Sequence, residues 1–354
     1  MSIVSSYLVR TILKTTLLVL GVLLALAGLF EFIGELDDAE GSYGAMQALL
    51  FAGLRLPQLA FEMLPIAALM GALLGLGGLA SSSELVVMRT AGLSVWRLAG
   101  SVAISGAVLM VVMFLVGEFI GPPLDYFART MRSETKLEQS DMRTGVAAWV
   151  KDGPVIINLE RINSDFEFGG IHLFRFAADG SLESIARAEN SGIDKDDQWV
   201  LESFRETRFD NDGVQVVESS RAVASFELDS ELLGVAMVKP VSLSGRGLVA
   251  YIRYLRKNNL SAERYESELW SRVASTATVV IMPVLALAFV FGPLRSAGSG
   301  GRLMVGVLIG LGYFLASRML SSSGQVFDLN PALVIWFPTI ALMLIAGFAL
   351  RRVT

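Results

Sequence analysis

Histidine and cysteine, two side chains that often perform catalysis, are nearly absent from this chain. It has one histidine, His172, and no cysteine. His172 lies in a stretch of alternating apolar and polar residues that is typical of a strand. A Ser/His/Asp triad and a metal site of the His or Cys type therefore have too few residues to form. We predict no catalytic residue and no metal site.

A nucleotide-binding loop is also missing from the sequence. No G-x-x-x-x-G-K-S/T string occurs, and GLGGLA (75–80) lies inside an apolar stretch instead of after a strand. We therefore expect the chain neither to hydrolyse ATP nor to bind a cofactor by itself. Small residues at these positions favour close helix packing instead, at Gly71, Gly75, Gly77 and Gly78 and at the pairs Gly117/Gly121 and Gly306/Gly310.

The composition places the chain in a membrane. Its 354 residues are 53% hydrophobic and have a mean hydropathy of +0.57, which is too apolar for a globular protein of this length. The net charge of −5 gives no reason to expect nucleic-acid binding.

Six apolar stretches are long enough to cross the ~30 Å hydrocarbon core as helices. The second contains Pro57 and Pro65 but no polar turn, so we interpret it as one long, kinked helix. An even number of spans puts both termini on the same side. The stretches are residues 15–36, 45–80, 95–121, 267–292, 302–321 and 331–350.

Basic residues in the short loops set the orientation, because they stay preferentially in the cytoplasm. One side carries Arg10, Lys14, Arg89, Arg97, Arg295, Arg302, Arg351 and Arg352, whereas the opposite short loops carry Asp37, Asp38, Glu40 and Asp328. We predict cytoplasmic termini and an exported segment between the third and fourth spans. The long apolar run after Lys14 lacks a cleavage pattern and is expected to remain as an anchor.

The exported segment changes from helical to two-residue periodicity. Short alternating runs separated by Gly, Asp and Asn turns predict an all-β domain, either a sandwich or a jelly roll, followed by an amphipathic helix near 248–255. The runs are residues 145–150, 154–160, 171–177, 199–206, 213–219 and 222–228. The predicted organisation is therefore spans one to three (1–121), a jelly-roll-like β domain with its flanking helix (122–265), and spans four to six (266–354).

The loop between the second and third spans, SSSELVVMRTAGLS (81–94), has the pattern of a short helix at about 82–92. Ser81 and Glu84 have the spacing of a capping box, and Gly92 provides a stop. This helix is either an interfacial connector or a contact surface for a separate ATPase. The residues alone do not favour one over the other.

Several strings resemble one protein family over almost the full length. They are LPIAALMGALLGLGGLASSSELVVMRTAGLS (64–94), GEFIGPP (117–123), WVKDG (149–153) and FVFGPLRS (289–296). They are similar to the LptF/LptG permeases, the membrane subunits of the ABC transporter that extracts lipopolysaccharide from the inner membrane of Gram-negative bacteria. SELVVMRTAG and GPLRS are more similar to the LptG than to the LptF branch.

The resemblance implies a set of partners. They are an LptF-like permease, a dimer of the LptB ATPase that binds ATP and Mg²⁺, and the single-span LptC protein. It also favours the coupling role for the 82–92 helix, with Glu84, Leu85, Met88 and Arg89 at the ATPase. The implied function is extraction of lipopolysaccharide from the outer leaflet and its transfer to a periplasmic bridge.

The resemblance further implies where lipopolysaccharide would bind. Arg129 and Arg132 match basic positions of the family and would meet the phosphates of the head group, although arginines at a span's end also anchor ordinary lipid head groups. Glu31, also expected near the head group, stands where some relatives have Lys, and it pairs with a basic residue on a neighbouring helix, pairs with a cation-bridged substrate, or lies at the interface. The apolar cavity wall would contain Phe30, Phe32, Leu311, Phe314 and Leu315.

Other functions remain possible at this stage. The chain is either LptG-like or an LptF-like paralogue of the same complex. A permease that uses ATP hydrolysis to move an exported domain without a substrate is a further class, but we expect four spans there. An intramembrane enzyme would need more than the carboxylates Glu31, Glu62 and Glu118 that the spans provide.

Overall fold

The computed structural model describes most of the chain in twelve ranges. They are residues 3–37, 43–137, 148–160, 167–168, 170–177, 179–193, 198–210, 213–224, 226, 240–292, 298–326 and 330–353. The predicted basic loop residue Arg295 and the acidic residues Asp38, Glu40 and Asp328 lie outside these ranges.

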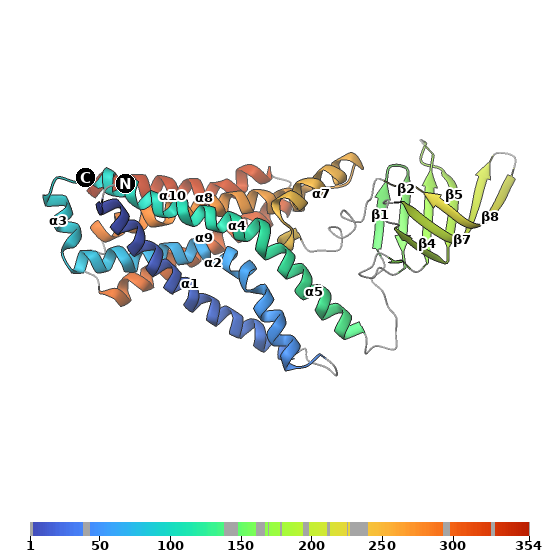
Figure 1. Ribbon diagram of the computed structural model, residues 1–354. Coiled ribbons are helices and arrows are strands. Elements are labelled where there is room, and N and C mark those ends of the chain that lie inside the picture. The colour runs from blue at the N-terminus through green and yellow to red at the C-terminus, as the bar shows by residue number, and fades with distance from the viewer. Residues whose placement is uncertain are drawn as a thin grey trace. The chain divides into compact units, whose positions relative to one another are not determined.

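Within the described ranges, six helices are long and apolar enough to cross a membrane, as predicted (Figure 1). The third of these is continuous from α4 through a short π-helix, η1, into α5, and the second is a single helix that contains both prolines. Their bounds are α1 (Ile3–Asp37), α2 (Ala45–Ser81), α4 (Val95–Leu115), η1 (Val116–Ile120), α5 (Gly121–Leu137), α8 (Glu263–Phe291), α9 (Ser299–Val326) and α10 (Pro331–Val353).

The chain divides into two compact units. The helical unit comprises residues 1–129, 244–248 and 263–354, and the second unit comprises residues 130–243 and 249–262.

The third span, Val95–Arg132, extends past residue 121, where we placed its end. Pro122 and Pro123 do not stop it, because they directly follow the π-helical turn Val116–Ile120, where the regular helical hydrogen bonding is already interrupted.

Glycines let the helices of the first unit approach each other, which explains their number in α2. A Cβ on Gly71 would collide with the backbone of Thr16 in α1, and Thr15 donates a hydrogen bond to the Gly71 carbonyl at 2.7 Å. On another side of α2, a Cβ on Gly306 of α9 would lie 2.9 Å from Leu73. The packing interpretation is correct at these positions but wrong at Gly78, which faces open space.

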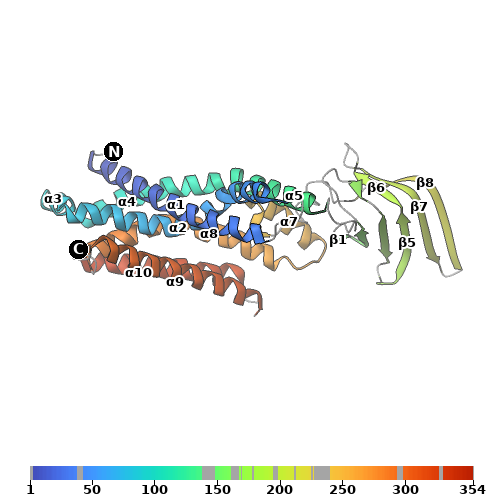
Figure 2. The same ribbon diagram turned by 90° about the horizontal axis from the view of Figure 1, so that it is seen from below.

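One apolar core joins most helices of this unit. Fully buried side chains include Ile12 of α1, Leu73 of α2, Leu98 of α4 and Met282 of α8, and α10 adds Ala346. Between helices in lipid, such side chains stabilise the fold mainly through close van der Waals packing, because lipid tails are as apolar as the core. Figure 2 shows α9 and α10 side by side at the edge of this unit.

The second unit contains one antiparallel sheet in its described residues. Its order is β1-β2-β4-β5-β7-β6-β3, with β8 paired to β7. This confirms the predicted helical membrane protein with an inserted β domain. The strands are β1 (Ala148–Asp152), β2 (Val155–Leu159), β3 (Glu167–Phe168), β4 (Ile171–Phe176), β5 (Leu182–Ala188), β6 (Asn190–Ile193), β7 (Trp199–Asp210) and β8 (Gly213–Ala224).

Some strands escaped prediction for a physical reason. β5 buries Ser184, Ala186 and Ala188, which are too small or too polar to produce an apolar alternation. The runs 213–219 and 222–228 were predicted as separate strands, but the structure joins most of them in β8, which pairs with β7 along its length.

Two interactions of this unit involve titratable side chains. Burial opposes ionisation of Glu206, but hydrogen bonds from Arg208 (2.8 Å) and Ser184 (2.9 Å) outweigh it and hold the pKa of Glu206 below its usual value. In the amphipathic helix α7 (Gly245–Lys257), the Tyr254 hydroxyl donates to the Lys151 carbonyl at 2.6 Å. Burial raises the pKa of Tyr254 to about 12.

Candidate functional site

The short helix predicted between the second and third spans is α3 (Glu84–Thr90), and it lies at the same end of the helical unit as both termini (Figure 1). The predicted capping box is wrong, because Ser81 is the last residue of α2 and Ser83 precedes α3 with a left-handed backbone (φ 63°). The predicted stop is correct. Gly92 has φ +88°, and the Leu93 N–H closes the end of α3 on the Met88 carbonyl at 3.2 Å.

The apolar side chains of α3 face in two directions. Leu85 is 1% exposed and belongs to the core of the helical unit, and Met88 packs partly against that core. Leu85 therefore presents little surface to a partner, and its contact with an ATPase stays a prediction. Val86 and Val87 are 43% and 63% exposed instead. The sequence marked all of these as apolar, but a seven-residue helix gives too little periodicity to separate its two faces.

The charged side chains of α3 connect it to the spans. Glu84 accepts hydrogen bonds from the Tyr7 hydroxyl of α1 and the Ser82 hydroxyl, both at 2.8 Å. The Arg89 guanidinium lies over the Phe291 ring at the end of α8, 5.4 Å from its centroid. A displacement of α3 would thus be transmitted to α1, α2 and α8.

A second charged group, which we call the arginine network, joins Glu31, Arg55, Asp125 and Arg129. Arg55 of α2 pairs with Glu31 of α1 and donates to Asp125 of α5 at 3.0 Å. Arg129 donates through Nε to the other oxygen of Asp125 at 2.8 Å. The Asp125 side chain is fully buried, whereas those of Arg55 and Arg129 are 19% and 28% exposed.

The arginine network decides between the alternatives for Glu31, which pairs with a basic residue on a neighbouring helix. Sequence reasoning missed Arg55 and Asp125, although two signals were available. An arginine within an apolar span is costly unless it is paired, and Asp125 and Arg129 have the four-residue spacing of a helical ion pair. Arg132 lies one turn further along α5 and is partly buried.

Glu118, the third carboxylate noted in the spans, holds two helices together. It accepts hydrogen bonds from the N–H groups of Gly245 (2.7 Å) and Arg246 (3.1 Å) at the start of α7. Gly117 lies in the same π-helical turn as Glu118, and its carbonyl accepts a hydrogen bond from Arg272 of α8 at 2.9 Å. The role of Glu118 is to cap the N-terminal end of α7.

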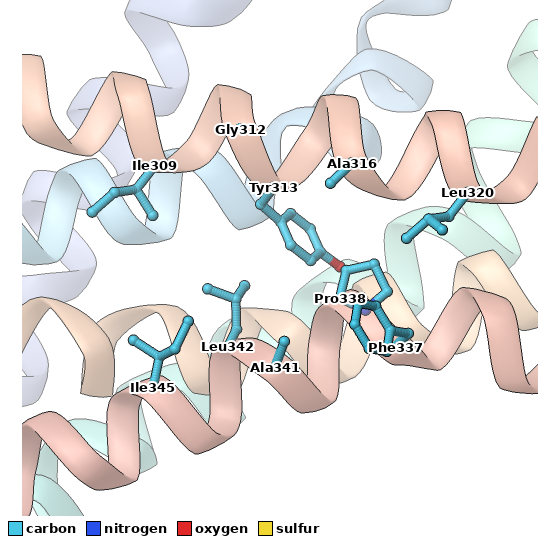
Figure 3. Close-up of a pocket in the computed structure, with 10 residues that line it drawn as sticks. All are labelled: Ile309, Gly312, Tyr313, Ala316, Leu320, Phe337, Pro338, Ala341, Leu342 and Ile345. Carbon is cyan, nitrogen blue, oxygen red and sulfur yellow. The ribbon is translucent and has the colours of Figure 1, made fainter.

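An apolar cavity of about 260 Å³ lies between α9 and α10. Figure 3 shows Tyr313 of α9 pointing toward Pro338 of α10 across it. The predicted wall residues Leu311, Phe314 and Leu315 do not line this cavity and are 47%, 37% and 49% exposed. On α1, Phe30 is 71% exposed and Phe32 is half-buried.

The described residues contain no cluster of three or more acidic, His or Cys side chains that could hold a metal ion. His172 lies on β4 and interacts with Glu160 through Nε2 at 3.2 Å, as expected for a structural residue.

The six helices, the inserted antiparallel unit and the short helix beside both termini define a multi-pass membrane protein of the permease type. The model of one family, "Lipopolysaccharide export system permease LptF/LptG", matches residues 6–352. The chain belongs to this family.

Two named groups of relatives are similar over nearly the full length. The lipopolysaccharide export system permease protein LptG of Escherichia coli K12 is 31% identical, covering 99% of this chain and 98% of the relative. LptG of Haemophilus influenzae Rd is 28% identical over 98% and 97%. LptF of Escherichia coli K12 is 24% identical over 94% and 90%. The similarity is thus greater to the LptG branch.

Proposed function

We propose that this chain is the LptG-like permease subunit of an ABC transporter that extracts lipopolysaccharide from the outer leaflet of the inner membrane and passes it to a periplasmic bridge. The observation that carries the proposal is the full-length family match, with 31% identity to an LptG and 24% to an LptF. The termini and α3 would be cytoplasmic and the β unit periplasmic, because Arg10, Arg97 and Arg351 belong to the end with the termini.

The energy for extraction would come from a separate subunit. This chain has no phosphate-binding loop of its own, so ATP and Mg²⁺ would bind to an LptB-like ATPase dimer. An LptF-like permease would form a pseudo-symmetric pair with this chain, and an LptC-like single-span protein would complete the complex.

The coupling contact would be α3. Val86 and Val87 present apolar surface beside the half-buried Glu84 and the exposed Arg89, which gives an ATPase groove both an apolar and a polar point of contact. Leu85 anchors α3 to the core from within. ATPase movement would therefore reach the spans as a displacement of a firmly attached helix.

The cargo would follow the outward faces of α1 and α9. Phe30, Leu311 and Leu315 leave exposed apolar surface of the kind that acyl chains require, and the arginine network supplies cations for phosphates. Substrate would enter between the first span of one permease and the fifth span of the other. Closure of the ATPase dimer would then narrow the space between the two permeases and expel the lipid.

Photocrosslinking in the reconstituted complex tests this proposal. A photoreactive residue at Leu315 of α9 should label lipopolysaccharide, and ATP should reduce this labelling because the lipid leaves the space between the two permeases. Met343 of α10, which is 54% exposed, is the matched control. Its label should be independent of ATP. Equal labelling of both positions, unaffected by ATP, would contradict transport along α9.

A further inference from the structure

One face of the β unit carries a row of planar side chains across six strands. Direct cross-strand partners in an antiparallel sheet point to the same face, and the partners here follow one another from Trp149 of β1 to Glu218 of β8. We call this set the planar row, because each member ends in a flat indole, amide, imidazole, guanidinium or carboxylate group. Its members are Trp149, Asn158, His172, Arg187, Arg205 and Glu218.

The β1 end of the planar row is an aromatic platform. The Trp149 and Phe174 rings lie nearly parallel, with centroids 6.0 Å apart and planes 24° apart, and His172 lies nearly parallel to Phe174 at 6.5 Å and 19°. These separations are typical of offset stacking, so the rings do not cover one another and Trp149 stays 67% exposed. Because tryptophan is highly buried on average, an exposed tryptophan held by a stack favours a ligand surface.

The β7–β8 end of the row is polar, and its two ion pairs balance in charge. Arg205 Nε lies 2.7 Å from Glu218 Oε1, and Arg187 Nη2 lies 3.8 Å from Glu160 Oε1. An anion would have to displace a carboxylate from either arginine. A hydroxyl group would not, because it both donates and accepts hydrogen bonds, and each pair places an acceptor beside a donor.

This polar end is also hollow. A cavity of about 440 Å³ lies over β5, β7 and β8, within the ~300–1,000 Å³ range of small-molecule sites. Arg187, Arg205 and Glu218 line it together with Ser203, whose left-handed backbone (φ 53°) is uncommon for a residue other than glycine. Three members of the planar row therefore belong to a cavity of the size that a small ligand requires.

A saccharide has both kinds of surface that this face offers. The C–H bonds of a sugar ring form an apolar face that packs on the negative face of an aromatic ring, and the hydroxyl groups at its edge donate and accept hydrogen bonds. A stable protein contact instead needs ~800 Å² from each partner and an apolar centre. The middle of the planar row is polar, since Asn158, His172 and Arg187 occupy it.

We propose that the planar row and its cavity form a saccharide-binding site. Trp149 is the stacking platform, and the pairs Arg205–Glu218 and Arg187–Glu160 bind hydroxyl groups. The occupant is the oligosaccharide of lipopolysaccharide. The choice of this sugar rests on the proposed function, whereas saccharide binding itself does not.

Calorimetric titration of the reconstituted complex, with the full chain in phosphatidylcholine nanodiscs, tests the site. The probe is the oligosaccharide of lipopolysaccharide, freed of acyl chains and phosphates, and maltohexaose is the comparison saccharide. Trp149→Leu keeps an apolar side chain without a ring, and Trp149→Phe keeps a ring. Arg205→Gln removes a hydroxyl partner. Arg208→Gln is its matched control, because Arg208 is also an exposed, glutamate-paired arginine of β7 but lies on the opposite face.

The wild type should bind the oligosaccharide more tightly than maltohexaose. Trp149→Leu should raise the dissociation constant by about tenfold, because the stacking surface is lost, whereas Trp149→Phe should raise it by less than roughly threefold. Arg205→Gln should raise it by about fivefold through the loss of hydrogen bonds from a charged group. Arg208→Gln should leave it unchanged.

The contrary results separate the inference from the proposed function. If the wild type binds no saccharide, or if Trp149→Leu binds as the wild type does, the saccharide site is wrong and the proposed function stands. Equal affinity for maltohexaose would keep the site and overturn its assignment to lipopolysaccharide. Loss of the LptF-like permease from the Trp149→Leu complex, with saccharide affinity unchanged, would make this face a protein interface. Intact saccharide binding by a complex that never releases lipopolysaccharide would refute the proposed function alone.

Discussion

Replacing Leu85 or its two exposed neighbours with alanine should separate the stability of α3 from its coupling role. Leu85 is 1% exposed in the core, so Leu85→Ala should lower the free energy of unfolding by about 3 kcal/mol, within the ~2–5 kcal/mol range for buried leucines. Val86 and Val87 are 43% and 63% exposed. Their double replacement should leave stability within ~0.5 kcal/mol of the wild type.

The same double replacement should weaken association with the ATPase. Each Val→Ala change removes two methyl groups, each worth ~0.8 kcal/mol on burial. Scaled by the exposed fractions of Val86 and Val87, the loss on binding is about 1.7 kcal/mol, or roughly twentyfold in the dissociation constant.

Thermal unfolding and binding of the ATPase dimer, both measured on the permease complex in nanodiscs, give the two quantities. Val249→Ala serves as the control at an exposed valine of α7, away from α3. Unchanged ATPase affinity in the Val86/Val87 variant would refute α3 as the apolar contact. A stable Leu85→Ala protein would refute the anchoring role of Leu85.

Three further outcomes follow from the structure. Gly71→Val should separate α1 from α2 at Thr16 and lower the thermal unfolding temperature by an amount equivalent to ~1–3 kcal/mol, whereas Gly78→Val, at a position facing open space, should not. The contribution of Glu206 to stability should be present above pH ~4.3 and lost as the pH falls through its lowered folded pKa. Unfolding scans between pH 6 and pH 3 should therefore show a smaller loss of stability for Glu206→Gln than for the wild type. The contribution of Tyr254 to stability should be present below pH ~10 and lost as the pH rises toward 12. The absorbance of tyrosinate should therefore rise at a higher pH in the folded wild type than in the unfolded chain.

Long apolar runs allowed the membrane-spanning helices to be predicted from the sequence. A ~20-residue span leaves little choice of structure, since every backbone polar group must be satisfied within the helix. α2 continues through Pro57 and Pro65 because, in a span, neighbouring helices and local adjustments can satisfy the backbone groups that a proline frees. The end of the third span could not be predicted from the sequence, because the helix continues from a π-helical turn through Pro122 and Pro123 into polar sequence.

The candidate sites could be predicted only in part, because they depend on which helices pack against each other. Sequence identified Glu31 as a carboxylate in need of a partner, but Arg55 lies on another helix and only packing brings the two together. In α3, composition could not distinguish the buried Leu85 from the exposed Val87. Local spacing alone would have paired Asp125 with Arg129, which the structure also does.

The central claim is that this permease converts ATP hydrolysis by a partner into extraction of lipopolysaccharide. The most direct measurement is the amount of lipopolysaccharide that leaves proteoliposomes for a periplasmic acceptor per ATP hydrolysed by the reconstituted complex. Release should require ATP, and it should fall when Val86 and Val87 are replaced. Sustained ATP hydrolysis by a fully assembled complex without any release of lipopolysaccharide would contradict it.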